Sequence, residues 1–310
     1  MATSTLTARL VNPLVNGLLA IAPLANWAKH RARTMMIERA ESLGVPWRQI
    51  VADLRTQDLD ADLAKVKNPD LIYPDYYLTS FHAYAEGNLG WEPAIEVEVA
   101  AYAVHSRIFA PEKTNQPSRE GDAMLRASFH QVLEKLEKPQ DILDIGCSVG
   151  MSTFALQDIY PEAEITGLDL SPYFLAIAAR NSEKVPLRQK ISWIHAAAEN
   201  MPLADQSFDL ISLSLVCHEL PQAATHQILQ ECRRLLRPNG HLAIMDMNPQ
   251  SQIYAKMPPY ILTLLKSTEP YLDQYFGLDM AKLMGESGFR HISITCNTPR
   301  HRVILAQVSE

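Results

Sequence analysis

Apolar and polar positions alternate in blocks that predict short buried strands, each followed by a helix, from about residue 139 onward. The apolar run at 141–145 predicts a strand, and a helix is expected to begin near Met151 after a turn of small residues. After the next apolar strand, Ser171 is a good N-cap and Pro172 a good first helical residue. The pattern therefore predicts a second helix, which continues through Arg180.

The region from residue 34 to about residue 138 has a mainly helical pattern. The predicted helices, of which the first two are opened by prolines, span residues 47–54, 94–109 and 126–137. A polar segment at 111–121 is a candidate domain boundary. We therefore expect two domains: an N-terminal helical cap at residues 1–117 and a ligand-binding domain at residues 118–310.

The turn after the first strand has the composition of a nucleotide-binding loop. Gly146 and Gly150 lack a Cβ atom, so their backbone can approach a ligand closely, and the following helix presents free N–H groups at the same point. Asp169 ends the next apolar strand, where it can hold a ribose. A nicotinamide dinucleotide site requires G-x-G-x-x-G for its pyrophosphate. This chain has Gly146-Cys-Ser-Val-Gly150 instead, so that pattern fails.

The stretch from Asp144 to Gly150 resembles motif I of the class I S-adenosylmethionine (SAM) methyltransferases, acidic-x-G-x-G-x-G, with Ser148 at the middle glycine. The resemblance extends from about Pro139 to the C-terminus. It implies an α/β fold: a Rossmann-like seven-stranded sheet with an antiparallel last strand, here preceded by an N-terminal helical cap. The segments that match the other strands of this fold are 163–172, 191–195, 207–216, 236–246, 289–296 and 302–308.

The same resemblance implies which residues bind SAM. Asp169 matches the ligand of the ribose hydroxyls, and Leu170 would lie against the adenine. The loop after the third strand matches G-D-A-E-x-L-P-F but has Ala197 in place of the Asp, so the adenine would rely on Ala198 and Glu199. The residues expected to bind SAM are Asp144, Gly146, Cys147, Ser148, Gly150, Asp169, Leu170, Ala198 and Glu199.

Within this class, the chain is most similar to the small-molecule branch that includes the ubiquinone and menaquinone biosynthesis methyltransferases. The segments 169–172, 198–202, 205–209 and 236–240 carry this similarity. It implies transfer of a methyl group to a small, apolar or aromatic molecule by in-line displacement. The alternative is a SAM-binding regulatory or scaffold protein without catalysis, which the substitution at Ala197 permits.

Composition narrows the choice of partners. The net charge of −7 and the pI of about 5.8 argue against nucleic-acid binding, and Met257-Pro-Pro-Tyr260 lies after the fifth strand rather than near the fourth. The four cysteines lack metal-ligand spacing, so we expect no metal site. They are better explained as small buried thiols of a cytoplasmic protein. The sequence assigns no oligomeric state and contains no apolar run long enough for a spanning helix.

Residues 1–37 contain no acidic side chain, since the first one is Glu38. Three interpretations stay open. The segment could be a cleaved targeting peptide, although polar interruptions make it a poor one. It could lie in a membrane surface, with Trp27 and a basic cluster at the headgroups, which would make the protein peripheral to a membrane. It could also form helices that pack on the catalytic domain or on another subunit.

Two segments are candidate walls of an acceptor site. Aromatic and polar residues concentrate between residues 71 and 92, which suits either a ligand pocket or a helix–helix interface. The apolar segment 248–276 follows the fifth strand, at the edge of the sheet where ligands bind in such folds. The first candidate general base is His218, at the end of the fourth strand, followed by His82 and Tyr84.

Overall fold

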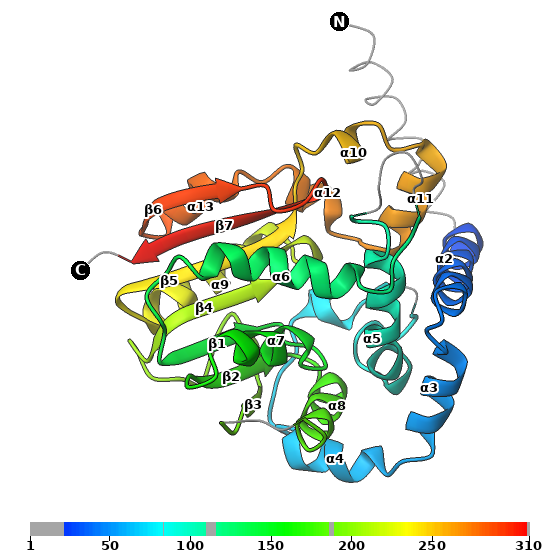
Figure 1. Cartoon of the computed structure of the whole chain (residues 1–310), viewed down its shortest axis with the longest axis horizontal. Helices are drawn as coiled ribbons and strands as arrows, with labels where there is room; N and C mark the ends of the chain where they lie inside the picture. The colour runs from blue at the N-terminus through cyan, green and yellow to red at the C-terminus, as the bar shows by residue number, and fades with distance from the viewer. Residues whose placement is uncertain (1–21, 83, 110–115, 186–188, 309–310) are drawn as a thin grey trace, which may run out of the picture.

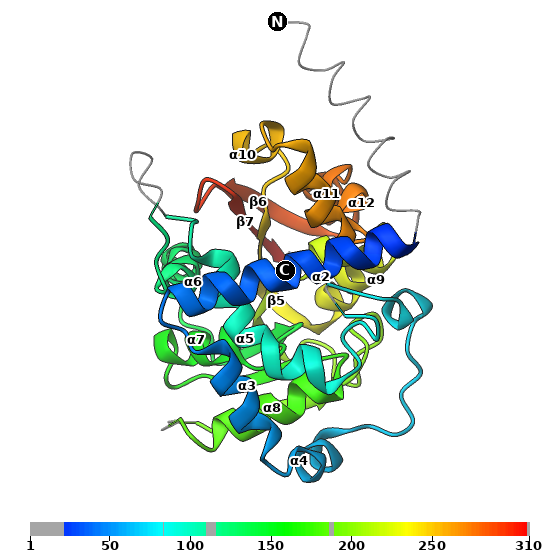
Figure 2. The same ribbon diagram turned by 90° about the vertical axis from the view of Figure 1, so that its right-hand side faces the viewer.

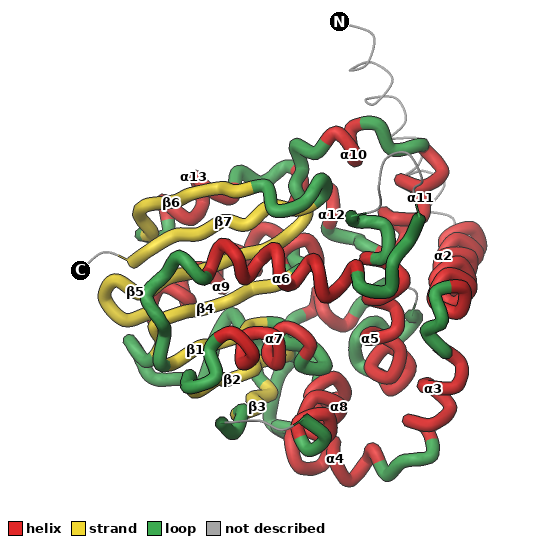
Figure 3. The backbone as a smooth tube through the Cα atoms, viewed as in Figure 1, coloured by secondary structure: helices red, strands yellow, loops and turns green. Residues whose placement is uncertain are grey.

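A seven-stranded sheet forms the centre of the molecule in the computed structural model, which describes residues 22–82, 84–109, 116–185 and 189–308. The strands are β1 (Asp141–Ile145), β2 (Glu164–Asp169), β3 (Ser192–His195), β4 (Phe208–Ser214), β5 (Leu236–Met247), β6 (Phe289–Thr295) and β7 (His301–Val308). Their order across the sheet is β3-β2-β1-β4-β5-β7-β6 (Figures 1 and 3). Strands β1 to β5 are parallel, and β7 is antiparallel to both of its neighbours. The Rossmann-like sheet with its antiparallel strand is confirmed.

Helices cover both faces of the sheet because both faces are apolar. Along β1, Ile142 packs in the same buried cluster as residues of α6 (Gly121–Leu133) and α7 (Met151–Ile159). The next residue, Leu143, packs with α9 (Gln222–Leu235) on the opposite face, since successive side chains of a strand alternate. Figure 1 shows α6 and α7 in front of the sheet and α9 behind it.

The N-terminal helices share a core with the sheet domain. They are α2 (Ala22–Ser42), α3 (Trp47–Arg55), α4 (Leu59–Val66), η1 (Asp75–Leu78) and α5 (Trp91–His105). Trp47 and Val99 pack in one buried cluster with Phe174 of α8 (Pro172–Ser182). Ser171 caps α8 as expected, because its Oγ accepts a hydrogen bond from Phe174 N. Figure 2 shows α2 lying across the molecule, and it contacts both α5 and α11 (Pro259–Thr268).

Two predicted helices have different bounds in the structure. Helix α5 begins at Trp91, two residues before Pro93, because the first turn of a helix tolerates a residue without an N–H donor. Helix α6 spans 121–133 rather than 126–137. Its buried side chains Leu125, Phe129 and Leu133 recur every four residues, so the apolar stripe ends at Leu133.

Short elements complete the fold. They are η2 (Cys217–Glu219), α10 (Gln252–Ala255), α12 (Leu272–Phe276) and α13 (Met280–Glu286), the last of which contacts β6. Of the four cysteines, Cys147, Cys217 and Cys232 are buried as expected. Cys296 is exposed, contrary to expectation, because it directly follows the edge strand β6. Among the helices of the described ranges, none is both long and apolar enough to span a bilayer. Residues 1–21, which carry most of the proposed membrane-surface segment, lie outside the described residues.

Candidate functional site

The loop after β1 is held tightly against the end of β2. Gly146 N and Cys147 N donate to Leu168 O at 2.8 and 3.1 Å. Gly146 has φ +68°, and a Cβ atom there would lie 2.5 Å from Val216 Cγ2, so only glycine fits. Ser148 is also left-handed, with φ +50°. Its hydroxyl is buried and has no partner among the described residues, so it is available to a ligand.

Asp169 is fixed by the backbone on both sides. Ser148 N donates to its Oδ2 at 2.8 Å, and Ser171 N donates to its Oδ1 at 2.8 Å. Burial raises the pKa of Asp169 to about 7, although the two backbone N–H donors oppose this shift. Each carboxylate oxygen keeps a free lone pair, so the side chain can accept two hydroxyl groups of one ligand.

Asp144 lies behind this loop. Its Oδ2 accepts hydrogen bonds from Ser152 Oγ at 2.6 Å and Thr153 Oγ1 at 2.7 Å, which fixes the first turn of α7. Burial raises the pKa of this carboxyl group, and its Oδ1 has no partner among the described residues. Seven of the nine residues expected to bind SAM line one cavity. Asp144 and Gly150 do not line it.

That cavity, of about 570 Å³, opens at the carboxyl ends of the strands. Leu170, Ala198 and Glu199 line it beside the loop after β1. Glu199 Oε1 accepts a hydrogen bond from Tyr76 OH at 2.6 Å, so η1 of the N-terminal region closes this side. The buried Oε2 of Glu199 has no partner among the described residues. The Ser148 hydroxyl and Glu199 Oε2 lack hydrogen-bond partners within the ranges that the structure describes, and the glycine loop lets its backbone come close to a ligand. Together they fit an adenosine ligand that carries polar groups at its ends.

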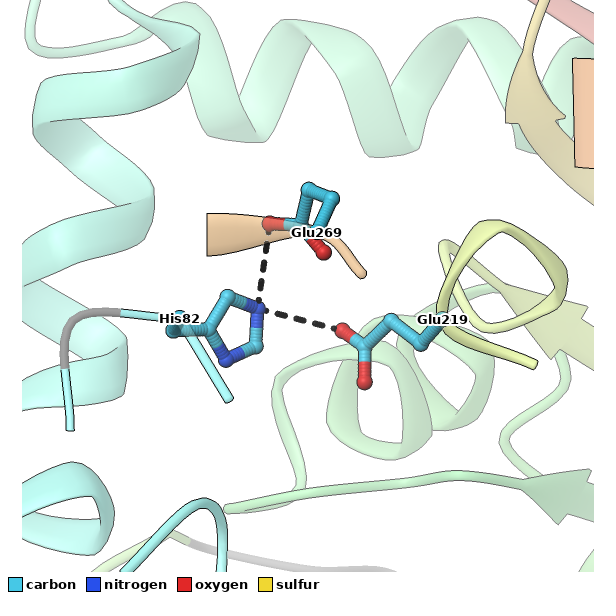
Figure 4. A group of neighbouring side chains, drawn as sticks. All are labelled: His82, Glu219 and Glu269. Atoms are coloured by element: carbon cyan, nitrogen blue, oxygen red, sulfur yellow. Dashed lines mark ion pairs between the residues drawn. The ribbon is translucent and has the colours of Figure 1, made fainter. Parts of the chain in front are cut away.

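Polar side chains gather on the wall across from the glycine loop. His218 Nδ1 lies 2.7 Å from Asp246 Oδ1, and His218 Nε2 lies 4.0 Å from Glu269 Oε2. His82 Nε2 lies 3.3 Å from Glu219 Oε1 and 3.6 Å from Glu269 Oε1 (Figure 4). The structure therefore brings the two predicted histidines together with three acidic residues.

The protonation of this group follows from its charges. Burial alone would lower the pKa of His82, but Glu269 and Glu219 raise it to about 9. Burial likewise opposes charge on His218, and Asp246 and Glu269 raise its pKa to about 10. Burial raises the pKa of Glu269, while the two histidines lower it. Both imidazoles carry a proton at neutral pH.

Tyr84 also lines the cavity, but its hydroxyl is engaged elsewhere. Tyr84 OH donates to Glu96 Oε2 at 2.6 Å, and Arg33 Nε donates to the same oxygen at 2.9 Å. Glu96 is 1% exposed. This group ties α2, α5 and the segment before α5 together, so the Tyr84 hydroxyl helps to fix the cavity wall.

Much of the rest of the wall is apolar, although Arg39, Arg126 and Arg300 also line it. Met35 and Met36 of α2, Val97 and Val104 of α5, and Ile261 and Leu265 of α11 line it. Among the aromatic residues that make the 248–276 segment a candidate wall, Tyr271, Tyr275 and Phe276 do not line the cavity, and Tyr275 is buried with its hydroxyl donating to Met247 O at 2.7 Å. The side chains of Tyr260 and Leu264 lie outside the described part of the structure.

Sequence reasoning assigned no role to several polar residues of the site, among them Asp246, Glu269, Asn88 and the arginines Arg39, Arg126 and Arg300 of the cavity wall. Asp246 stands near the end of an apolar strand, and Glu269 follows an apolar helix, so both are acidic residues in buried surroundings. That pattern is a usable signal, because charged side chains are seldom buried without a partner. Asn88 is buried, with 5% of its surface exposed, and it lies within the aromatic segment 71–92. No sequence pattern marks it as a buried polar residue.

Known proteins similar to this chain are methyltransferases. A family profile described as "Methyltransferase domain" matches residues 143–244. An uncharacterized methyltransferase of Synechocystis is 32% identical over 164 residues, which cover 52% of this chain and 73% of that protein. A demethylmenaquinone methyltransferase of Listeria welshimeri is 30% identical over 115 residues, and the match spans 37% of this chain and only 48% of that relative.

The fold also occurs in a solved methyltransferase structure. Phosphoethanolamine N-methyltransferase 2 of Haemonchus contortus, in complex with S-adenosyl-L-methionine, superposes with a TM-score of 0.51 at 12% identity. The match covers 73% of this chain and 62% of that one. At this identity the likeness concerns the fold alone.

Proposed function

This chain belongs to the class I SAM-dependent methyltransferases, and we propose that it methylates a small molecule with an apolar or aromatic body and a polar reacting group. One observation carries this proposal. A single cavity is lined by the glycine loop and Asp169, by the histidine–carboxylate group, and by apolar side chains of α2, α5 and α11. Cofactor, reacting group and apolar body would each meet suitable chemistry there.

The residues around the glycine loop would hold SAM, which supplies an activated methyl group when bound. Asp169 would accept the ribose hydroxyls, and the Ser148 hydroxyl would meet a polar end of the ligand. Leu170 and Ala198 would contact the adenine ring, with Glu199 beside it. Asp144, which does not line the cavity, would act through the first turn of α7.

The acceptor's reacting group would lie against His82, His218 and Glu219. His218 is oriented by Asp246 and presents Nε2 on the cavity side, so it would position the acceptor by donating a hydrogen bond. An acceptor that carries an O–H must lose its proton, and we propose that Glu219, whose side chain is 25% exposed, takes it. Holding the acceptor in line with the methyl group is the larger task of the protein.

The apolar wall supports an apolar acceptor. Six side chains of α2, α5 and α11, among them two methionines, face the same cavity, and methionine adapts to ligands of irregular shape. A ring compound such as the demethylmenaquinone named in the relatives suits this wall. Residues 1–117 would act as the cap that closes the site, since α2, η1 and α5 supply much of it.

Contact with a membrane surface is a further part of this proposal. Trp27 on α2 is 67% exposed, which suits a side chain at the headgroup level. The protein should sediment with anionic liposomes, and a variant that lacks residues 1–28, and with them Trp27, should sediment less. A full chain that does not sediment, or a deletion that leaves sedimentation unchanged, would contradict membrane contact through this segment without affecting the rest of the proposal.

The decisive experiment is calorimetric titration of the purified protein with SAM, combined with methyl transfer to a panel of acceptors. We expect SAM to bind, Asp169→Asn to weaken binding, and the exposed Asp158→Asn to bind as the wild type does. Apolar phenols or quinols should be methylated in preference to water-soluble acids and thiols. Binding of SAM without transfer to any acceptor would favour the non-catalytic alternative, and absence of SAM binding would overturn the proposal.

A further inference from the structure

His82, Glu219 and Glu269 come from three separate segments and point toward one another in the cavity (Figure 4). One ligand atom of each lies within 4.8 Å of the other two. With metal–ligand bonds of about 2.1 Å, neighbouring donor atoms in a metal site are roughly 3.0–3.4 Å apart. The two distances from His82 Nε2, 3.3 and 3.6 Å, already approach these values. Rotation of the Glu side chains would close such a shell.

Asn88 orients the imidazole of His82. His82 Nδ1 lies 3.3 Å from Asn88 Oδ1, an acceptor, so Nδ1 carries the hydrogen. A cation that displaces the proton of Nε2 would then meet a lone pair directed to the space between the two carboxylates. Asn88 is itself buried, and its backbone oxygen accepts a hydrogen bond from Ser171 Oγ at 2.6 Å. Histidines that bind metals are typically oriented in this way by a second hydrogen bond.

Glu269 supplies an independent indication of a missing ligand. The residue is 8% exposed, and its Oε2 accepts no hydrogen bond from any residue in the described ranges. The two nearby imidazoles do not fill this position: His82 Nε2 lies 3.6 Å from the other oxygen, Oε1, and His218 Nε2 lies 4.0 Å from Oε2 with its ring already paired with Asp246. A buried carboxylate requires compensating positive charge. Two carboxylates around an imidazole that has given up its second proton to make room for the cation match the charge of a divalent ion.

We propose that His82, Glu219 and Glu269 bind one divalent cation of the Mn²⁺, Fe²⁺ or Zn²⁺ class. One imidazole and two carboxylates suit these ions better than the oxygen-only preference of Ca²⁺. The site lies on the cavity wall where the proposed function puts the acceptor, and the role of the ion rests on that proposal. The sequence predicted no metal site because its cysteines lack ligand spacing, and these ligands are distant in the chain.

The ion would bind an oxygen of the acceptor. The O–H bond would break with its electron pair left on the oxygen, and the proton would go to water, since a metal-bound hydroxyl ionises closer to neutral pH. Water would then replace Glu219 as the proton acceptor. The ion would also orient the acceptor by fixing its oxygen at one point of the cavity.

The test is titration of the full chain, freed of metal with a chelator, with Mn²⁺ followed by electron paramagnetic resonance and with Zn²⁺ followed by elemental analysis. We expect one equivalent of ion to bind. His82→Ala and Glu219→Gln should each weaken binding at least about tenfold. Matched controls are the exposed His226→Ala on α9 and Glu286→Gln on α13, which should bind as the wild type does.

SAM titration of the same samples separates this inference from the proposed function. If the wild type binds SAM but neither ion, the metal site is refuted and the methyltransferase proposal stands. Ion binding that survives in both His82→Ala and Glu219→Gln also refutes the site. If one of these variants loses SAM binding through misfolding, the other decides. A wild type that binds an ion but no SAM supports the metal site and overturns the proposed function.

Discussion

At the scale of single residues, Asp169 couples cofactor binding to pH. Burial raises its pKa to about 7, so the carboxylate that would accept two hydroxyl groups predominates only above that pH. We expect SAM affinity to fall between about pH 8 and about pH 6. Asp169→Asn should remove this dependence and weaken binding roughly 10- to 100-fold, the value of a charged hydrogen bond. Calorimetry across this range, with Asp158→Asn as the control, checks it.

The same raised pKa affects stability with a defined sign. A carboxyl group whose pKa is raised from 3.8 to about 7 stabilises the fold at low pH, and that contribution is lost as the pH rises through about 7. The ligand-free protein should therefore gain more thermal stability from SAM at about pH 8 than at about pH 6. An equal gain at both pH values would contradict the assignment of Asp169.

Gly146 illustrates how a single missing methyl group shapes the loop. Gly146→Ala combines left-handed strain with a contact of 2.5 Å to Val216 Cγ2, so we expect it to lower the free energy of unfolding by at least about 1–2 kcal/mol. Gly285→Ala is the matched control, because its Cβ atom would meet nothing closer than 3.9 Å in helix α13. That change should stabilise by about 0.5–1 kcal/mol. Urea unfolding of both variants measures the difference.

At the scale of elements, two arginine–glutamate pairs attach the N-terminal helices to α5 with different strength. Arg33 on α2 pairs with Glu96, whose side chain is 1% exposed, whereas Arg55 on α3 pairs with Glu92 at 2.7 Å with both side chains about half exposed. Arg33→Met leaves a buried carboxylate without its cation and should cost about 3 kcal/mol. Arg55→Met should cost less than about 1 kcal/mol. Similar losses in chemical denaturation would contradict this account.

The elements show which parts of the fold are readable from sequence. Strand β1 and the start of α8 were predicted correctly, because Ile142, Leu143 and Ile145 give the buried strand an apolar signal and the Ser171-Pro172 cap is local. The predicted start of α6 was wrong, since Gly121 gives no helical signal and the position of the helix is determined by the packing of Leu125 and Phe129 in the core. The approach of Glu269 to His82 depends on the tertiary fold and has no local pattern.

At the scale of the whole molecule, the N-terminal helices form part of the wall against which the acceptor would lie. Met35→Trp on α2 fills apolar space in the cavity, so the KM for an apolar acceptor should rise roughly tenfold, as a loss of about 1.4 kcal/mol implies. SAM affinity should not change. Met124→Trp, at an exposed position on α6, is the matched control. An unchanged KM would place the acceptor elsewhere.

The position of β7 between β5 and β6 has a consequence for synthesis of the protein on the ribosome. Strand β5 is complete at residue 247, but its partner on that side, β7, begins at residue 301. Until residues 301–308 have been translated and released, the nascent chain carries the unpaired hydrogen-bonding groups of β5 and β6. Open strand edges of this kind attract other chains. The sheet therefore closes on this side only after residues 301–308 have emerged from the ribosome.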